Sequence, residues 1–202
     1  MSDADRQKWD ERYRAGAYQQ RDQPAEFLTR WLVQISPGRA LDVACGAGRN
    51  ALYLAQAGFV VDAVDVSRVG LGCARDSARD RGVNVNWIEH DLDRGIPGAD
   101  RYDLILMIRY VNPGLFRMLP ERLQPGGYLL CEEHLVTTAV VAGPENPRFR
   151  VQPGELEKAA SAMHILFHEE ALHEDPDGNT VALARLVAQA KPLSDNKEKH
   201  YK

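Results

Sequence analysis

The sequence lacks three kinds of feature, and each absence excludes a class of protein. No apolar run approaches the ~18 residues of a membrane-spanning helix, and the first ten residues are polar, which predicts a chain without a signal peptide. The three cysteines show no metal-ligand spacing, which indicates free thiols in a reducing compartment. A net charge of -4 gives no basic excess for binding nucleic acid. We therefore predict a cytoplasmic protein that binds neither membranes nor nucleic acids.

What is present is the composition of an ordinary globular domain, with 44% hydrophobic and 27% charged residues. Strand and helix patterns alternate over most of the chain, which is typical of a parallel, doubly wound sheet. The last two strand patterns are joined by the five-residue turn 175–179, which is too short for a parallel crossover. The sequence therefore predicts an α/β, Rossmann-like sheet of seven strands, mostly parallel, with a C-terminal antiparallel hairpin. The expected strands are 39–43, 59–64, 83–88, 102–108, 128–132, 165–174 and 180–190, and the expected helices include 5–13, 24–33, 68–81, 115–123 and 155–163.

The segment from Leu41 to Asn50 organises the chain, because it joins a buried strand to a helix through a glycine turn. Gly46 and Gly48 have no Cβ atom, so a ligand can approach the backbone closely at both positions. The helix begins immediately afterwards, and its free N–H groups and positive dipole end face the same place. This arrangement predicts a site for the polar end of a nucleotide-like ligand.

Three aspartates follow successive strands of the predicted sheet: Asp42, Asp65 and Asp91. Ligands of open α/β sheets bind beyond the carboxyl ends of the strands, where the strand order reverses. Asp65 can accept bonds from two ribose hydroxyls, Asp91 from an exocyclic amine such as that of adenine, and Asp42 can attract an ammonium or order the loop. Each acid alone can also be an ordinary helix cap or turn former. Together they suit a ligand with positive groups, and S-adenosylmethionine carries an ammonium and a sulfonium.

With these residues, the chain resembles the class I S-adenosylmethionine-dependent methyltransferases over nearly all of its length up to Ala190. The run 41–48 resembles that family's first motif, with Ala44 where a glycine usually stands. The terminal hairpin is also typical of the family. More narrowly, the segments 8–13, 49–55 and 109–127 are similar to the small tellurite-resistance-type and thiopurine-type methyltransferases.

The resemblance implies an enzyme with S-adenosylmethionine as its cofactor and a methyltransferase domain at 39–190. It also implies that helices within 1–38 pack on or cover the cofactor site, where Trp9 and Tyr13 form either a staple onto the core or part of a lid. Residues 191–202 have almost no apolar side chains, which predicts a disordered tail. No metal is expected. The expected cofactor-binding residues are Asp42, Cys45, Gly46, Gly48, Asn50, Asp65, Val66, Asp91, Leu92 and Ile108.

Two residues beyond the later strands are candidates for a catalytic role. Arg109 follows the most apolar strand, and it either orients an anionic acceptor or forms a salt bridge to a nearby acid. His134 either accepts a proton at neutral pH or is an ordinary polar residue at the start of a loop. The irregular segment 137–154 is long enough to be a lid, with Arg148 and Phe149 over the acceptor.

These features predict methyl transfer to a small-molecule acceptor that is soft or anionic, such as a thiol or a chalcogen oxyanion. The absence of an Asn-Pro-Pro-Tyr-type motif after the fourth strand disfavours methylation of nucleic acid bases. Two alternatives stay open. The spacing of Gly46, Gly48 and Ala51 also fits an NAD(P)-dependent oxidoreductase, although the hairpin and Asp91 count against it. A protein that binds S-adenosylmethionine without catalysis fits the same residues, and the oligomeric state is open.

Overall fold

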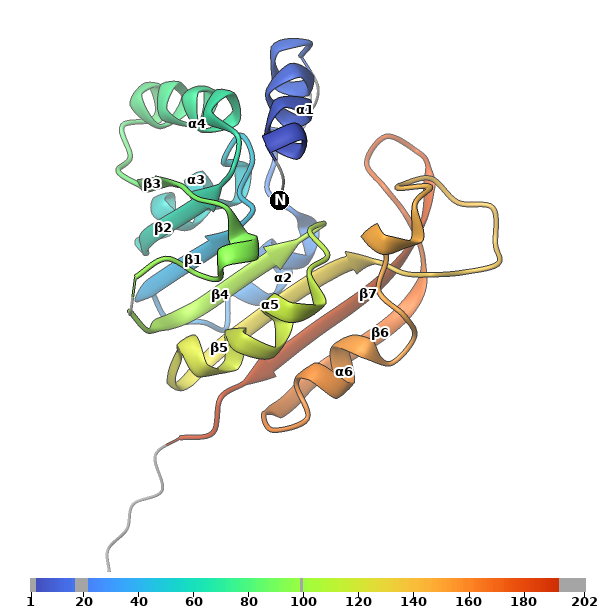
Figure 1. The fold of residues 1–202 in the computed structure, drawn as a ribbon. Coiled ribbons are helices and arrows are strands. Elements are labelled where there is room, and N and C mark those ends of the chain that lie inside the picture. Colours follow the sequence, from blue (N-terminus) through green and yellow to red (C-terminus); the bar gives the residue numbers. More distant parts are fainter. Residues whose placement is uncertain (1–2, 17–21, 99, 193–202) are drawn as a thin grey trace, which may run out of the picture.

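The computed structural model describes residues 3–16, 22–98 and 100–192, which form one sheet with helices on both faces (Figure 1). The sheet has seven strands in the order β3-β2-β1-β4-β5-β7-β6. The strands from β1 to β5 pair in parallel, whereas β7 is antiparallel to both β5 and β6. The predicted sheet, mostly parallel with a C-terminal antiparallel hairpin, is therefore confirmed. The strands are β1 (Arg39–Val43), β2 (Val60–Asp65), β3 (Asn86–Glu89), β4 (Tyr102–Ile108), β5 (Leu123–His134), β6 (His164–Glu174) and β7 (Thr180–Gln189).

Two apolar clusters hold the helices onto the sheet. Leu28 and Leu54 join one face, and Phe116 and Leu156 join the other. Side chains alternate across a strand, so a central strand that is buried on both faces is apolar where both faces are covered, as β4 is from Leu104 to Ile108. The helices are α1 (Asp3–Arg14), α2 (Glu26–Leu32), α3 (Arg49–Gln56), α4 (Arg68–Arg81), α5 (Pro113–Met118) and α6 (Glu155–Ala159), with short 3-10 turns η1 (Leu92–Arg94), η2 (Leu119–Arg122) and η3 (Pro147–Phe149).

The strand order reverses at β1, because β2 lies on one side of it and β4 on the other. Connections from β1 and β4 therefore leave the sheet in opposite directions at the same carboxyl edge. The parallel register aligns Val43 with Val64 and with Met107, and Met107 with Cys131. The segments that follow β1, β2, β4 and β5 thus meet at one edge, where a ligand site is expected.

Several predicted boundaries are wrong by a few residues. The helix expected at 115–123 is α-helical only to Met118 and continues as η2, because Pro120 has no N–H and cannot extend an α-helix. The strand expected at 83–88 begins at Asn86, since Gly82 is left-handed and the N–H of Val83 is bound to Ala78. The helix expected at 155–163 ends at Ala159.

The fifth strand is longer than predicted, because the turn at 124–127 is absorbed into it. Between two neighbouring pairs of partners, β4 advances from Tyr102 to Leu104 while β5 advances from Leu123 to Tyr128. The extra β5 residues include Gly126, which has a φ of 80°. The strand then continues two residues past Glu132, which brings His134 into the sheet.

Within the described ranges, no helix combines the length and apolarity needed to cross a membrane. The tail predicted to be disordered lies, from residue 193 onward, outside the described residues.

Candidate active site

The loop between β1 and α3 is built from left-handed backbone. Ala44, Gly46 and Gly48 have φ values of 57°, 58° and 83°. This conformation is costly for a residue with a Cβ atom, so Ala44 occupies a position that favours glycine. A Cβ at Gly46 would collide with the hydroxyl of Tyr13, and one at Gly48 would lie 2.6 Å from the ring of Trp87. The loop therefore has no side chain at these two positions, and Tyr13 and Trp87 pack against its backbone at the N-terminus of α3.

Asp65 connects this loop to the end of β2. Its carboxylate accepts hydrogen bonds from the N–H groups of Gly46 and Ser67, each at 2.8 Å. Burial raises its pKa, and these backbone donors oppose that shift. Asp65 thus orders the glycine loop, and its two oxygens keep additional lone pairs for hydroxyl donors.

Asp42 lies beneath the loop and is 2% exposed. Burial raises its pKa to about 7, an effect that the N–H of Ala51 and the charge of Arg49 reduce. Among the described residues, its Oδ2 atom has no hydrogen-bond partner. A buried carboxylate oxygen without a donor fits an ammonium group, and the bare loop above it fits the amino-acid end of S-adenosylmethionine.

Helix α1 lies over the glycine loop. The Asp10 carboxylate accepts from the Ser67 hydroxyl at 2.6 Å and from the N–H of Val69 at 3.1 Å, so it holds α1 to the start of α4. The Tyr13 ring also lies 2.9 Å from the place where a Cβ would stand on Gly70. The aromatic face of α1 is therefore in contact with the loop, which is the position expected for a lid.

The other predicted cofactor residues differ in how they are placed. Asp91 begins η1, where its carboxylate accepts from the N–H of Asp93 at 3.0 Å, and Leu92 beside it is buried in the core.

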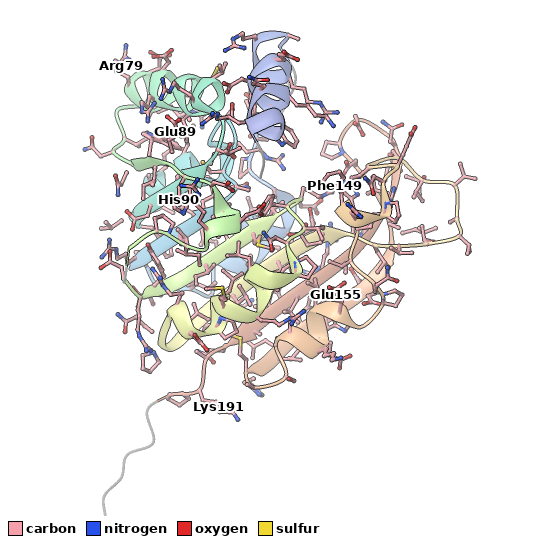
Figure 2. The ribbon with its side chains drawn as sticks, viewed as in Figure 1. Arg79, Glu89, His90, Phe149, Glu155 and Lys191 are labelled. Atoms are coloured by element: carbon pink, nitrogen blue, oxygen red, sulfur yellow. The ribbon has the colours of Figure 1, made fainter. Side chains whose placement is uncertain are left out.

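Asn50 is engaged elsewhere, because its Oδ1 atom accepts from the N–H of Ala25 at 2.9 Å and joins α3 to the segment before α2. Cys45 accompanies Gly46 in the loop and is partly exposed, whereas Val66 and Ile108 are buried at the ends of their strands. The Glu89 and His90 side chains lie on the β3 side of this edge (Figure 2).

Arg109 lies directly after β4 with a φ of 60°, which turns its guanidinium toward β5 and the hairpin. It donates to Glu132 at 3.0 Å and to Asp175 at 2.7 Å, and its third nitrogen lies 3.3 Å from Nε2 of His134. Of the two roles that the sequence left open for Arg109, the salt bridge is present, and its partners are Glu132 and Asp175. Glu133 points to the opposite face because successive side chains of a strand alternate.

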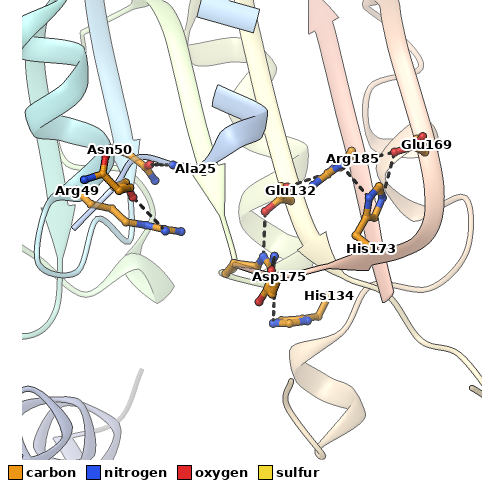
Figure 3. A network of polar contacts seen from close by, with 11 residues as sticks. Ala25, Arg49, Asn50, Glu132, His134, Glu169, His173, Asp175 and Arg185 are labelled. Atoms are coloured by element: carbon orange, nitrogen blue, oxygen red, sulfur yellow. Dashed lines mark hydrogen bonds and ion pairs between the residues drawn. The ribbon is translucent and has the colours of Figure 1, made fainter. Parts of the chain in front are cut away.

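The Arg109 contacts continue into a wider charged network (Figure 3). Glu132 also accepts from Arg185 at 2.8 Å, and Arg185 lies 3.1 Å from Nδ1 of His173, whose other nitrogen lies 3.1 Å from Glu169. Burial and the charge of Arg185 lower the pKa of His173. Sequence reasoning missed Arg185 and His173, because Arg185 binds Glu132 from 53 residues away and His173 joins the network only through the pairing of β6 with β7.

His134 is fixed by its neighbours. The guanidinium of Arg109 can only donate, so Nε2 of His134 accepts and the ring carries its proton on Nδ1. A Cβ on Gly143 would stand 2.6 Å from the same ring, so the loop after β5 packs tightly against it. His134 therefore holds Arg109 and the loop together.

The irregular segment after β5 is pinned to the sheet by Arg150 rather than Arg148. Arg150 donates to the carbonyl oxygens of Leu135, Ala142 and Pro144 at 2.8 to 3.3 Å. The N–H of Val151 adds a 2.7 Å bond to the carbonyl of His134. Phe149 is half exposed and lies in η3, on the side of this segment that faces α1 (Figure 2). The segment is thus held at the carboxyl edge of β5.

In the part of the chain that the structure describes, no group of three or more histidine, cysteine, aspartate or glutamate side chains is arranged to hold a metal ion.

The fold and the glycine loop resemble those of the class I S-adenosylmethionine-dependent methyltransferases. Residues 40–127 match the family model described as "Methyltransferase domain". The match covers β1 to the start of β5, which includes the glycine loop, Asp65 and Asp91. S-adenosylmethionine is the cofactor of this class, and the Asp42 and Gly46 geometry fits it.

Within this class the chain is similar to TehB. It is 25% identical over 170 residues to the "Probable S-adenosyl-L-methionine-dependent methyltransferase TehB" of Haemophilus influenzae (strain 10810), covering 78% of this chain and 59% of the relative. The crystal structure of TehB from H. influenzae matches with a TM-score of 0.74 and 24% identity, covering 90% of this chain and 67% of that one. The magnesium protoporphyrin IX methyltransferase (ChlM) of Synechocystis PCC 6803, solved with bound SAM, matches with a TM-score of 0.60 and 18% identity over 81% and 76% of the two chains. The chain thus spans about three fifths of the length of its TehB relative.

Proposed function

We propose that this protein transfers the methyl group of S-adenosylmethionine to a small acceptor with a soft nucleophilic atom, such as a thiol or a chalcogen oxyanion. The observation that carries the proposal is the joint placement of the bare glycine loop, the Asp65 carboxylate and the orphaned oxygen of Asp42 at the carboxyl edge of β1 and β2. The similarity to TehB supports the choice of acceptor.

The chain's own residues supply binding and orientation. The backbone at Gly46 and Gly48 receives the amino-acid end of the cofactor, with Asp42 facing its ammonium, and Asp65 faces the ribose hydroxyls. Asp91 and Leu92 lie where the adenine is expected. When bound, the cofactor supplies an activated methyl group. Methyl transfer from a sulfonium is an in-line displacement, so holding the two reactants in line accounts for much of the acceleration.

We assign Arg109 and His134 a positioning role in this reaction. Arg109 already carries two carboxylate partners, so an anionic acceptor would have to displace Asp175 to reach its guanidinium. Arg109 and His134 instead connect the end of β4 to the hairpin and to the loop after β5. The acceptor then lies against the ends of β4 and β5, beneath α1 and the 137–150 segment.

The test is turnover of S-adenosylmethionine to S-adenosylhomocysteine with a panel of acceptors. The panel contains small thiols, selenite and tellurite, and matched alcohols and amines as controls. Product formation with a thiol or a chalcogen oxyanion, but not with the alcohols and amines, is expected. Binding of S-adenosylhomocysteine without turnover of any acceptor would favour a non-catalytic binding protein instead.

A further inference from the structure

Glu133 is a buried carboxyl group to which no side chain of the described residues donates a hydrogen bond. It is 0% exposed, and neither of its side-chain oxygens makes a hydrogen bond within the described residues. The neighbouring Glu132 is equally buried but is bound by Arg109 and Arg185. An unpaired buried acid costs stability, so its presence calls for an explanation beyond folding.

The place of Glu133 in the sheet is at the site. It is the penultimate residue of β5, beside the end of β4, on the carboxyl edge that carries the glycine loop. It belongs to the face that carries Cys131, opposite the charged network, with Ala184 of β7 as its register partner. The apolar cluster on this face includes Tyr110, Leu135 and Val151. Glu133 therefore lies between the end of β4 and the segment that covers β5.

The surroundings of Glu133 favour its neutral form. Burial raises its pKa well above the ordinary value, and Glu132 adds to that shift, whereas Arg109 and the N–H of Tyr110 oppose it. Cys131 on the same strand is a buried neutral thiol whose pKa is also raised by burial. Two charged residues lie on the elements that cover this face. Arg150, in the segment after β5, donates to carbonyl oxygens, and Glu155 of α6 accepts from the N–H of Gln152. The charge of Arg109 is already balanced by Glu132 and Asp175.

Tyr110 connects Glu133 to the cofactor side of the edge. Its backbone N–H lies near Glu133, while burial and the charges of Asp93, Asp91 and Asp65 raise the pKa of its hydroxyl to about 12. The Tyr110 hydroxyl lies 3.5 Å from the Asn112 amide, which donates to Asp93, so Tyr110 lies between the acids that follow β3 and Glu133. The acceptor is expected between these two groups.

We propose that Glu133 is the group that takes the proton from a protic acceptor, so that the substrates include neutral thiols and not only preformed anions. The acceptor's sulfur forms a bond to the methyl carbon while the carbon–sulfonium bond breaks and its electron pair stays on the cofactor's sulfur. The acceptor loses its S–H proton to a Glu133 carboxyl oxygen. The charges balance, because one positive charge on the cofactor and one negative charge on Glu133 both disappear.

The proposal rests on the proposed function, and it adds a relation between ligand charge and protonation. A positive charge at this edge favours ionised Glu133, so binding of the sulfonium form should release the Glu133 proton. S-adenosylhomocysteine lacks the sulfonium, so Glu133 keeps its proton in that complex. Both ligands carry the same ammonium, so any proton that Asp42 loses on binding is common to both and cancels in the comparison.

Calorimetric binding of S-adenosylmethionine and S-adenosylhomocysteine, each in two buffers of different ionisation enthalpy, measures the protons released without any turnover. We expect wild-type protein to release up to about one more proton with S-adenosylmethionine than with S-adenosylhomocysteine. Glu133→Gln should abolish this difference while leaving S-adenosylhomocysteine affinity within about twofold. Asp42→Asn is the matched control, because it should change the proton count for both ligands and preserve the difference.

Equal proton counts for the two ligands in wild-type protein would overturn the proposal, as would a Glu133→Gln variant that retains the difference. If neither ligand binds, the cofactor assignment itself fails, and the role of Glu133 fails with it. Should Glu133→Gln not fold, an infrared difference spectrum of the two wild-type complexes decides. Loss of the C=O stretch of a protonated carboxyl in the S-adenosylmethionine complex is expected, and its persistence in both complexes would refute the idea.

Discussion

Asp42 of β1 and Asp65 of β2, the two aspartates beside the glycine loop, differ in their hydrogen bonds. Asp65 is satisfied by the N–H groups of Gly46 and Ser67, whereas Asp42 has one oxygen without a donor. Asp65 therefore holds the loop in its conformation, and Asp42 has an oxygen free to bind a positive group of a ligand. This difference allows each residue to be tested by a different measurement.

Asp65→Ala is expected to weaken binding of S-adenosylhomocysteine. A hydrogen bond to a charged group contributes roughly 1.5–3 kcal/mol, so the affinity should fall by about 10- to 150-fold. The melting temperature should also fall, because the N–H groups of Gly46 and Ser67 lose their acceptor. Calorimetry and a thermal melt measure the two effects, and Asp65→Asn, which keeps one acceptor oxygen, should lie between wild type and alanine. Unchanged affinity in a folded alanine variant removes Asp65 from the cofactor site.

Asp42→Asn is expected to change how stability depends on pH. The pKa of Asp42 is about 7 in the fold, above its ordinary value, so the folded state binds more protons than the unfolded state between these two values. The stability that protonated Asp42 provides is therefore present at low pH and is lost as the pH rises through 7.

Asparagine cannot ionise, so the stability of the variant relative to wild type should increase between pH 5 and pH 8. The change should be on the order of 1–3 kcal/mol, which is about 2–12 °C in melting temperature for a chain of this size. Thermal melts across this range measure it, with the exposed Asp76→Asn as a control that should show no such trend. A pH-independent difference at position 42 would mean that Asp42 is already ionised in the fold.

At the scale of elements, α1 is joined to the start of α4 through Asp10, whose carboxylate accepts from the Ser67 hydroxyl and from the N–H of Val69. The sequence left a staple and a lid open for Trp9 and Tyr13, and Tyr13 lies against Gly46 and Gly70.

We predict that Asp10→Ala speeds dissociation of S-adenosylhomocysteine without destabilising the sheet. Loss of the two bonds should lower affinity by about 5- to 30-fold, since they contribute roughly 1–2 kcal/mol. Stopped-flow displacement measures the rate, and Glu11→Ala, an exposed acid on the same helix, is the control. A lower melting temperature with unaltered dissociation would instead make α1 a staple.

At the scale of the whole molecule, local patterns predicted the sheet but not the contacts that close it. Turn length was enough to predict the antiparallel hairpin, and the alternation of Leu104 to Met107 between the two faces explains the apolar run of β4. The glycine loop and Asp65 were also readable, because strand, turn and acid are adjacent in the chain. By contrast, the partner of Arg109 on β5 depends on which of two adjacent glutamates lies on the same face of the sheet as its guanidinium. The sequence alone does not distinguish Glu132 from Glu133 in this respect.

An ion pair between residues far apart in the sequence joins the turn of the β6–β7 hairpin to the end of β4. Asp175 lies 66 residues from Arg109 and binds it at 2.7 Å, with both side chains largely buried. This contact ties the antiparallel hairpin to the parallel half of the sheet at the edge where the acceptor is expected. Its disturbance should therefore affect the fold and both ligands together.

Arg109→Lys tests this, because lysine keeps the charge but loses the planar fork that reaches Glu132, Asp175 and His134 at once. We expect a loss of about 1–3 kcal/mol in stability, which lowers the melting temperature by about 2–12 °C, and a change in both cofactor affinity and acceptor KM. Thermal melts and steady-state kinetics measure these effects. The exposed Arg148→Lys is the control and should change neither. A variant of normal stability whose acceptor KM rises while cofactor affinity is unchanged would show that Arg109 binds the acceptor directly.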